Sequence, residues 1–182
     1  KLTNHPRGDI SKKKNRGIII GATGATGSKL VKLLLKSDKW EKVTTISRKP
    51  VLEGKSNEKL NEVIINSFDQ LDQTFNNWKG HDSFFNCIGT TRKIAGGAKQ
   101  FVDIEYGISL MSAELANKAD IPNASVISAS GANPDGFSVD WIHPLLYAKT
   151  IGLKEETLTS HYNFNNVSIF RPGMLMRYYD ET

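Results

Sequence analysis

The chain has 182 residues, of which 38% are hydrophobic and 24% are charged, a composition typical of one globular domain with a full-sized core. No apolar run approaches the roughly 20 residues that cross a bilayer, and the single cysteine, Cys87, excludes an internal disulfide framework. The first 16 residues hold six of the 24 basic residues and one of the 19 acidic residues, which leaves residues 17–182 with 18 of each sign.

Because residues 17–182 carry no net charge, a nucleic-acid-binding face is not favoured. We predict neither a nucleic-acid partner nor a metal site. We divide the chain into a basic N-terminal tail, residues 1–15, and one domain, residues 16–182. The tail is interpreted as a solvated arm, as the remnant of a targeting segment or as a contact for an acidic protein partner. The lone cysteine favours a reducing compartment.

The first predicted elements are a strand over residues 17–20, a turn and a helix. The turn contains Gly21, Gly24 and Gly27 at intervals of three residues. In a dinucleotide site the first glycine takes the tight turn, the second lets a pyrophosphate approach the backbone, and the third lets the helix pack against the strand. Glycines at this spacing also occur in ordinary turns, but the strand before and the helix after favour a phosphate site.

A β-branched run over residues 43–47 predicts a second strand, which Arg48 and Lys49 follow. At this strand end a dinucleotide fold meets the adenosine ribose, where an acidic residue suits the 2′-hydroxyl of NAD and an arginine suits the 2′-phosphate of NADP. The two cations are either exposed charges at a surface strand end or ligands of NADP(H). Their combination with the glycine turn favours NADP(H).

A short third strand is predicted over residues 63–65, and Ser67 and Phe68 follow it at a position that lines an adenine pocket. Apolar residues at helical spacing over residues 71–78 predict a helix that packs against the core.

The nearly continuous apolar run over residues 83–88 predicts a central strand buried on both faces. Gly89 and Thr90 follow this strand, at the edge where open α/β sheets bind their ligands. Cys87 lies within the strand without an evident base, so we interpret it as a structural residue.

A long amphipathic helix is predicted next, because apolar residues step by three and four. These residues are Phe101, Ile104, Ile108, Met111 and Leu115. Further strands are predicted over residues 124–128 and 167–170, with a helix that starts near Pro144 between them. Strands and helices therefore alternate, which predicts an α/β domain with a doubly wound parallel sheet that ends after about six strands.

Five motifs occur in order: the glycine turn, Gly89-Thr90-Thr91-Arg92, Ser112-Ala113-Glu114-Leu115-Ala116, Ser128-Ala129-Ser130-Gly131-Ala132 and Phe170-Arg171-Pro172-Gly173. With them, residues 16–176 resemble the atypical short-chain dehydrogenase/reductases, most closely the Tat-interacting-protein-2-like oxidoreductases and their fungal mitochondrial relatives. The resemblance implies a Rossmann domain, NADP(H) as the cofactor and a mitochondrial location, with the cytoplasm as the alternative.

The resemblance also implies which residues contact NADP(H). The glycine turn binds the pyrophosphate, the cations after the second strand bind the 2′-phosphate, and the later strand ends meet the ribose and the nicotinamide. The expected cofactor residues are Gly21, Thr23, Gly24, Ala25, Thr26, Gly27, Arg48, Lys49, Ser67, Phe68, Gly89, Thr90, Lys149, Pro172 and Gly173.

The family's catalytic pattern is a serine after the fifth strand and a Tyr-x-x-x-Lys sequence on the next helix. The lysine holds the nicotinamide ribose and lowers the pKa of the tyrosine, which passes a proton to a carbonyl oxygen as hydride leaves the cofactor. Ser128 and Lys149 match the serine and the lysine, but Leu145 occupies the tyrosine position. Tyr147 stands two residues from Lys149 and, at about 100° per residue, points to nearly the opposite side of the helix.

We therefore expect an NADP-binding reductase-like protein whose catalysis is impaired or lost and which acts as a structural or accessory subunit of a larger assembly. The chain ends at Thr182, whereas family members continue into segments that complete the substrate pocket. The alternative is an active NADPH-dependent oxidoreductase of a small carbonyl substrate. Such an enzyme would use Ser128, Lys149 and an unconventional acid, either Tyr147 or His143.

Overall fold

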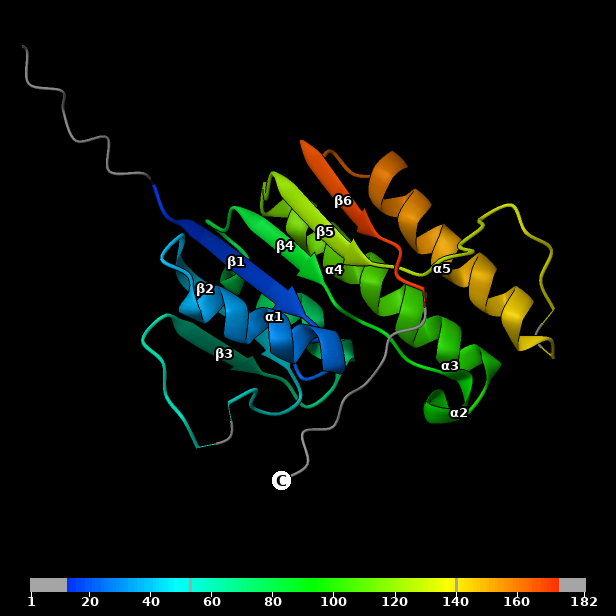
Figure 1. Ribbon diagram of the computed structural model, residues 1–182, viewed down its shortest axis with the longest axis horizontal. Helices are drawn as coiled ribbons and strands as arrows, with labels where there is room; N and C mark the ends of the chain where they lie inside the picture. The colour runs from blue at the N-terminus through cyan, green and yellow to red at the C-terminus, as the bar shows by residue number, and fades with distance from the viewer. Residues whose placement is uncertain (1–12, 53, 140, 174–182) are drawn as a thin grey trace, which may run out of the picture.

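A six-stranded sheet organises the fold, and each pair of neighbouring strands runs parallel (Figure 1). The computed structural model describes residues 13–52, 54–139 and 141–173. The sheet order is β3-β2-β1-β4-β5-β6, so that it reverses between β1 and β4, the place where doubly wound sheets bind dinucleotides. The strands are β1 (Asn15–Ile20), β2 (Trp40–Ser47), β3 (Leu60–Ile64), β4 (Ser83–Asn86), β5 (Asn123–Ile127) and β6 (Asn166–Phe170).

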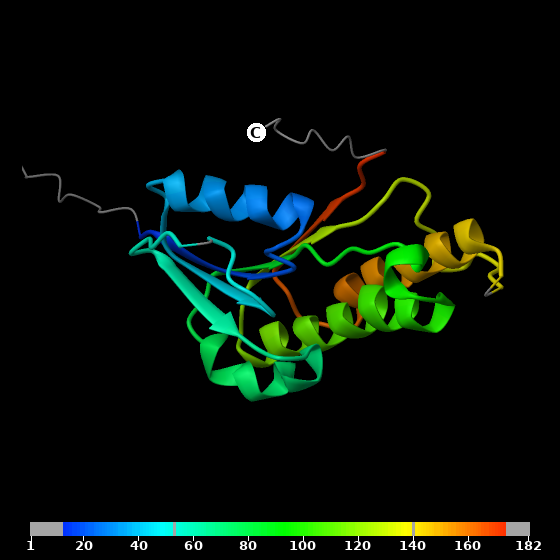
Figure 2. The ribbon, with the colours of Figure 1, turned by 90° about the horizontal axis from the view of Figure 1, so that it is seen from below.

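Helices lie on both faces of the sheet. In Figure 2, α1 lies on one side, and η1, α4 and α5 lie on the other. No helix among the described residues covers β5 and β6 on the α1 side. The helical elements are α1 (Ala25–Lys36), the 3-10 helix η1 (Phe68–Asn77), α2 (Arg92–Ala95), α3 (Ala98–Val102), the π-turn η2 (Asp103–Gly107), α4 (Ile108–Lys118) and α5 (His143–Ser160).

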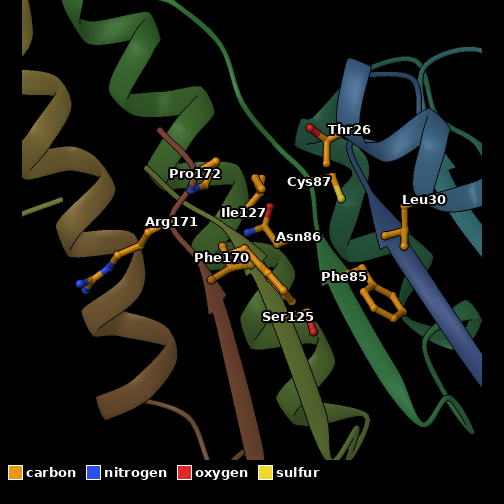
Figure 3. Close-up of a pocket in the computed structure, with 11 residues that line it drawn as sticks. Thr26, Leu30, Phe85, Asn86, Cys87, Ser125, Ile127, Phe170, Arg171 and Pro172 are labelled. Atoms are coloured by element: carbon orange, nitrogen blue, oxygen red, sulfur yellow. The ribbon is translucent and has the colours of Figure 1, made fainter. Parts of the chain in front are cut away.

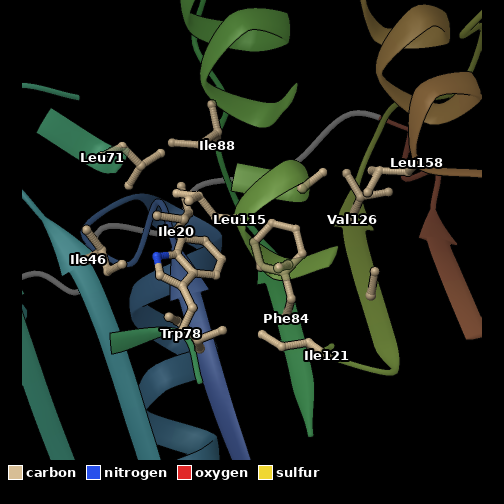
Figure 4. Packing of buried hydrophobic residues seen from close by; sticks show 14 of the residues in the cluster. Ile20, Ile46, Leu71, Trp78, Phe84, Ile88, Leu115, Ile121, Val126 and Leu158 are labelled. Atoms are coloured by element: carbon tan, nitrogen blue, oxygen red, sulfur yellow. The ribbon is translucent and has the colours of Figure 1, made fainter. Parts of the chain in front are cut away.

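Two clusters of buried apolar side chains hold these layers together, one on each face. In β1, Ile18 and Ile20 join the cluster on the α4 side, whereas Ile19 joins the cluster under α1. The larger cluster contains Trp78 and Phe84, whose ring centroids lie 5.6 Å apart (Figure 4). Because successive side chains of a strand point to opposite faces, an apolar run such as that of β1 is buried on both sides.

The predicted fold class and the six strands are confirmed, with strand ends shifted by a few residues. The boundary that the sequence suggests between the tail and the domain, after residue 15, lies close to the start of β1 at Asn15. Just before β1, the ammonium nitrogen of Lys13 lies 2.8 Å from a carboxylate oxygen of Asp82. Residues 1–12 of the predicted tail lie outside the described residues. Within the described ranges, no helix combines the length and the apolar content that a membrane span needs.

The predicted long helix is interrupted in the structure, where α3, the π-turn η2 and α4 follow one another. Phe101 and Leu115 are buried as predicted, but Met111 is 37% exposed, and the polar residues Glu105 and Ser109 are buried. A π-turn adds one residue to a helical turn and so changes which side chains face the sheet. The predicted apolar stripe is therefore wrong at Met111.

Candidate cofactor and active site

The turn between β1 and α1 has the geometry that its glycines predict. Gly21 has a φ of +78°, and a Cβ atom there would lie 2.5 Å from the backbone carbon of Cys87. A Cβ atom on Gly27 would lie 2.2 Å from the carbonyl oxygen of Gly21, so only glycine lets α1 approach β1 this closely. Gly24 is the N-cap, and no described side chain caps α1. The amide groups of the first turn are therefore suited to an anion.

The cations predicted to bind the 2′-phosphate lie beside a predicted adenine-pocket residue. Arg48 and Lys49 are exposed directly after β2, and the guanidinium carbon of Arg48 lies 5.6 Å from the centroid of the Phe68 ring. Ser67 accepts a hydrogen bond from the backbone N–H of Asp69 and caps η1. Two neighbouring strand ends thus bring a cation and an aromatic ring together, an arrangement that suits an adenosine with a phosphate on its ribose.

A buried ion pair holds the backbone that follows β4. Glu105 accepts a hydrogen bond from the backbone N–H of Thr90 at 2.6 Å, and Lys154 lies 3.1 Å from its other carboxylate oxygen. Lys154 also donates to the carbonyl oxygen of Ile88 at 3.4 Å. Neither charged residue was predicted from the sequence, although Glu105 follows the apolar Phe101 by four residues, a spacing that places both on one face of a regular helix.

Ser128 lies at the end of β5, where its hydroxyl donates to the carboxylate of Glu155. Arg171, directly after β6, donates from Nε to the same carboxylate at 2.9 Å. Burial raises the pKa of Glu155, but the hydrogen bonds from Arg171 and Ser128 outweigh burial and hold the pKa below its ordinary value. The predicted catalytic serine therefore joins the ends of β5 and β6 to α5.

The half-buried Tyr147 points into the protein from the first turns of α5. Its ring centroid lies 5.8 Å from that of Phe101 and 5.9 Å from that of His143. Burial raises the pKa of the Tyr147 hydroxyl, and the carboxylate of Glu105 raises it further. A raised pKa is opposite to the change that a reductase tyrosine needs in order to release its proton at neutral pH.

Helical geometry separates Tyr147 from Lys149. At about 100° per residue, Tyr147 points within about 20° of Lys154, whereas Lys149 points about 140° away from it. The residue one turn after Tyr147 is Ile151, which is 2% exposed. The face of α5 that Lys154 directs toward the end of β4 therefore carries Tyr147, and Lys149 lies on the other side of the helix.

A hollow of about 540 Å³ opens on the α1 side of β4, β5 and β6 (Figure 3). Burial raises the pKa of the Cys87 thiol in its wall to about 11, which agrees with the predicted structural role. Figure 3 shows Arg171 directed away from the hollow toward α5. The lining residues are Thr26, Leu30, Phe85, Asn86, Cys87, Ser125, Val126, Ile127, Phe170, Arg171 and Pro172.

The structure places most of the predicted cofactor residues along the carboxyl edge of the sheet. Thr23, Ala25 and Thr26 lie in the glycine turn and the start of α1, Gly89 and Thr90 follow β4, and Pro172 and Gly173 follow β6. Lys149 is not brought toward this group, because it projects from the other side of α5. The contacts of all these residues with NADP(H) stay predictions.

A parallel sheet whose order reverses beside a glycine-rich phosphate turn defines a dinucleotide-binding Rossmann domain. Residues 18–145 match the model of the NAD dependent epimerase/dehydratase family, and the chain belongs to that family.

The predicted resemblance to Tat-interacting-protein-2-like and fungal mitochondrial proteins is confirmed. Protein FMP52, mitochondrial, of Debaryomyces hansenii is 35% identical over 159 residues, which cover 87% of the chain and 66% of the relative. Protein HTATIP2 of Rattus norvegicus is 32% identical over 171 residues, which cover 93% of the chain and 66% of the relative. The chain thus spans just under two thirds of the length of these relatives.

A solved structure agrees with the fold. A putative NAD-dependent epimerase/dehydratase from Bacillus halodurans superposes with a TM-score of 0.71 at 17% identity, over 92% of this chain and 74% of the other. At this identity the likeness shows the shared fold and nothing about chemistry.

Proposed function

We propose that the protein binds NADP(H) as a member of the short-chain dehydrogenase/reductase group and that its catalysis is impaired or lost. One observation carries this proposal: the cofactor turn is complete, whereas α5 presents no tyrosine and lysine one turn apart. Tyr147 is followed one turn later by Ile151, and Lys149 is preceded one turn earlier by Leu145. Neither Tyr147 nor Lys149 therefore has the other member of the catalytic pair one turn away on the same face of α5.

Preference for NADP(H) over NAD(H) follows from the charges after β2. Arg48 and Lys49 offer two cations to a 2′-phosphate, and Phe68 supports the guanidinium of Arg48 from one side. The nearby carboxylate of Glu62 already accepts a hydrogen bond from the backbone N–H of Val51 at 2.6 Å. Glu62 lies within β3 and not at the end of β2, where the acid of an NAD site stands.

Loss of catalysis follows from the surroundings of the two candidate proton donors. Tyr147 has no lysine on its face within one turn, and its pKa is raised by burial and by Glu105. The hydroxyl of Ser128 donates to Glu155, and this bond must break before the hydroxyl can donate to a substrate. A positioned general acid contributes about 10²–10⁴-fold to a rate, so its absence would reduce turnover strongly.

We further propose a structural or accessory role in a larger assembly, in the mitochondrion. The location is supported by the name of the fungal relative, Protein FMP52, mitochondrial. The accessory role is supported by the apolar lining of the hollow and by Phe170, a large hydrophobic lining residue that is 58% exposed. The activity, substrates and partners of the whole protein belong to this proposal.

An active NADPH-dependent reductase of a small carbonyl compound is the second candidate. It is favoured by the orientation of Tyr147, which lies on the face of α5 that points toward the end of β4. In this case the hydroxyl of Tyr147 would act as the acid without a lysine neighbour, and Ser128 would first release Glu155.

One experiment separates the two candidates. The purified full chain is titrated with NADPH, and the oxidation of the bound NADPH is then followed with a panel of aliphatic and aromatic aldehydes and ketones. Binding without oxidation supports the proposal. Oxidation that a Tyr147→Phe variant abolishes establishes the second candidate, and failure to bind NADPH contradicts both.

A further inference from the structure

Glu105 and Lys154 form an ion pair in the protein interior that the proposed cofactor contacts do not use. Both side chains are 2% exposed, and the carboxylate and the ammonium nitrogen lie 3.1 Å apart. Glu105 comes from the π-turn η2 and Lys154 comes from α5. Through the N–H of Thr90 and the carbonyl oxygen of Ile88, the pair binds the backbone on both sides of Gly89.

Stability is a poor explanation for such a pair. Two charges taken out of water lose their hydration, and well-packed apolar residues of similar size in their place often leave a protein equally or more stable. The π-turn that carries Glu105 is a rare local structure that occurs frequently at functional sites. A role in holding the end of β4 in one conformation accounts for both features.

We propose that Glu105 and Lys154 are positioning residues for the nicotinamide half of the cofactor, an inference that rests on the proposed function. A dinucleotide crosses the sheet where its order reverses, with one mononucleotide over each half. Arg48 stands at the end of β2, on the adenosine half, whereas Gly89 and Thr90 follow β4, on the nicotinamide half. The pair touches no cofactor atom and acts by fixing the backbone around Gly89.

The test replaces both charges with apolar side chains of similar length in the full chain. We expect the double variant Glu105→Met/Lys154→Met to keep the melting temperature of the wild type or to exceed it. We expect its affinity for NADPH to fall by about tenfold or more, since backbone groups once held by charged partners become free to move. Its affinity for 2′,5′-ADP, which contains only the adenosine half, should stay within about twofold of the wild type.

Two further variants make the comparison specific. Glu105→Gln/Lys154→Met keeps an acceptor for the N–H of Thr90 without a buried charge, and it should recover part of the lost NADPH affinity. Glu114→Gln/Lys118→Met removes an exposed pair on α4, in which the two charged groups lie 2.6 Å apart, and should change neither affinity. Amide exchange at Thr90, measured by NMR without ligand, should be faster in the Met/Met variant than in the wild type.

The possible results distinguish a failure of the proposed positioning role from a failure of the proposed NADP(H) binding. Wild-type affinity for NADPH in the Met/Met variant, or equal loss of NADPH and 2′,5′-ADP binding together with a lower melting temperature, overturns the positioning role. A wild type that binds neither ligand contradicts the proposed function instead. In that case the exchange rate of the Thr90 amide decides whether the pair fixes the strand end.

Discussion

Tyr147 and Ile151 lie one turn apart on the face of α5 that also carries Lys154 toward the end of β4. The Tyr-x-x-x-Lys pattern implied by the family resemblance has a tyrosine and a lysine at this same spacing, one turn apart on one face of the helix. Ile151 is buried and packs in the interior, so the tyrosine that faces the strand end has no lysine one turn later. Lys149 stands on the other side of the helix, one turn after Leu145.

The first prediction follows from this geometry and uses two matched variants. Ile151→Lys places an ammonium one turn from Tyr147, where it lowers the pKa of the phenol, and should raise NADPH oxidation with a carbonyl panel by about tenfold or more. Leu145→Tyr places a phenol one turn from Lys149 but on the outer side, and should leave the rate unchanged. The opposite result, a gain with Leu145→Tyr alone, would show that Lys149 faces the cofactor. Melting temperatures of both variants check that the buried lysine is tolerated.

The second prediction separates packing from cofactor approach in the glycine turn. Gly27→Ala puts a Cβ atom 2.2 Å from the carbonyl oxygen of Gly21, so α1 must move, and the free energy of unfolding should fall by about 1–3 kcal/mol. Gly24→Ala places its Cβ atom 3.3 Å from the same oxygen. It should cost little stability but weaken NADPH binding, because the pyrophosphate must approach this position. Urea unfolding measures the loss of stability, and calorimetric titration measures the loss of NADPH affinity. If the two variants lost stability and affinity to the same extent, the separate roles of Gly27 in packing and Gly24 in pyrophosphate approach would be contradicted.

The third prediction concerns the role of Ser128. Ser128→Ala removes a hydrogen bond to the buried carboxylate of Glu155 and should lower the free energy of unfolding by about 1–3 kcal/mol. Ser130→Ala is the control, because the backbone N–H of Ser130 donates to the carbonyl oxygen of Pro172 at 2.9 Å. An alanine at position 130 keeps this hydrogen bond. If denaturant unfolding shows no difference between the two variants, Ser128 does not hold the strand ends together.

The fourth prediction is a pH dependence that arises from His81. Its Nδ1 lies 2.9 Å from the carbonyl oxygen of Trp78, which can only accept, and its Nε2 lies 2.9 Å from the hydroxyl of Thr44, so a neutral ring with its proton on Nδ1 satisfies both contacts. Burial lowers the pKa of His81 below the ordinary 6.5, despite the opposing hydrogen bond to Trp78. The unfolded chain therefore binds this proton at a higher pH than the native protein does.

It follows that the contribution of His81 to stability is complete above about pH 6.5 and is lost progressively as the pH falls below that value. In urea unfolding at a series of pH values, the wild type should lose more stability between about pH 7 and pH 5 than a His81→Gln variant does. Parallel curves for the two proteins would contradict the neutral, buried state of this ring.

Much of the fold could be predicted from the sequence because its signals are local. The alternation of apolar runs with helical patterns predicted the parallel sheet, and three glycines after the first run predicted the turn that the structure contains. The interruption by η2 could not be foreseen in the same way. The apolar steps through Ile104 and Met111 fit a regular helix, and only the structure shows that Glu105 and Ser109 are buried instead.

The candidate site was predictable where it depends on backbone and strand ends, and not where it depends on contacts between distant elements. Glu105 and Lys154 are 49 residues apart, and nothing local in the sequence pairs them. Likewise, the spacing of Tyr147 and Lys149 indicated that they point apart, but the neighbouring Phe101 was needed to show which of them faces the protein.

Binding of NADP(H) through the glycine turn and the cations after β2 can be measured in one calorimetric experiment. The full chain is titrated with NADPH and with NADH, beside an Arg48→Ala/Lys49→Ala variant. We predict that the wild type binds NADPH more tightly than NADH. We also predict that the variant loses about 1–3 kcal/mol of NADPH binding free energy, as expected for charged hydrogen bonds, and keeps its affinity for NADH. Equal affinity of the wild type for the two cofactors would contradict the proposed role of Arg48 and Lys49 in binding the 2′-phosphate of NADP(H).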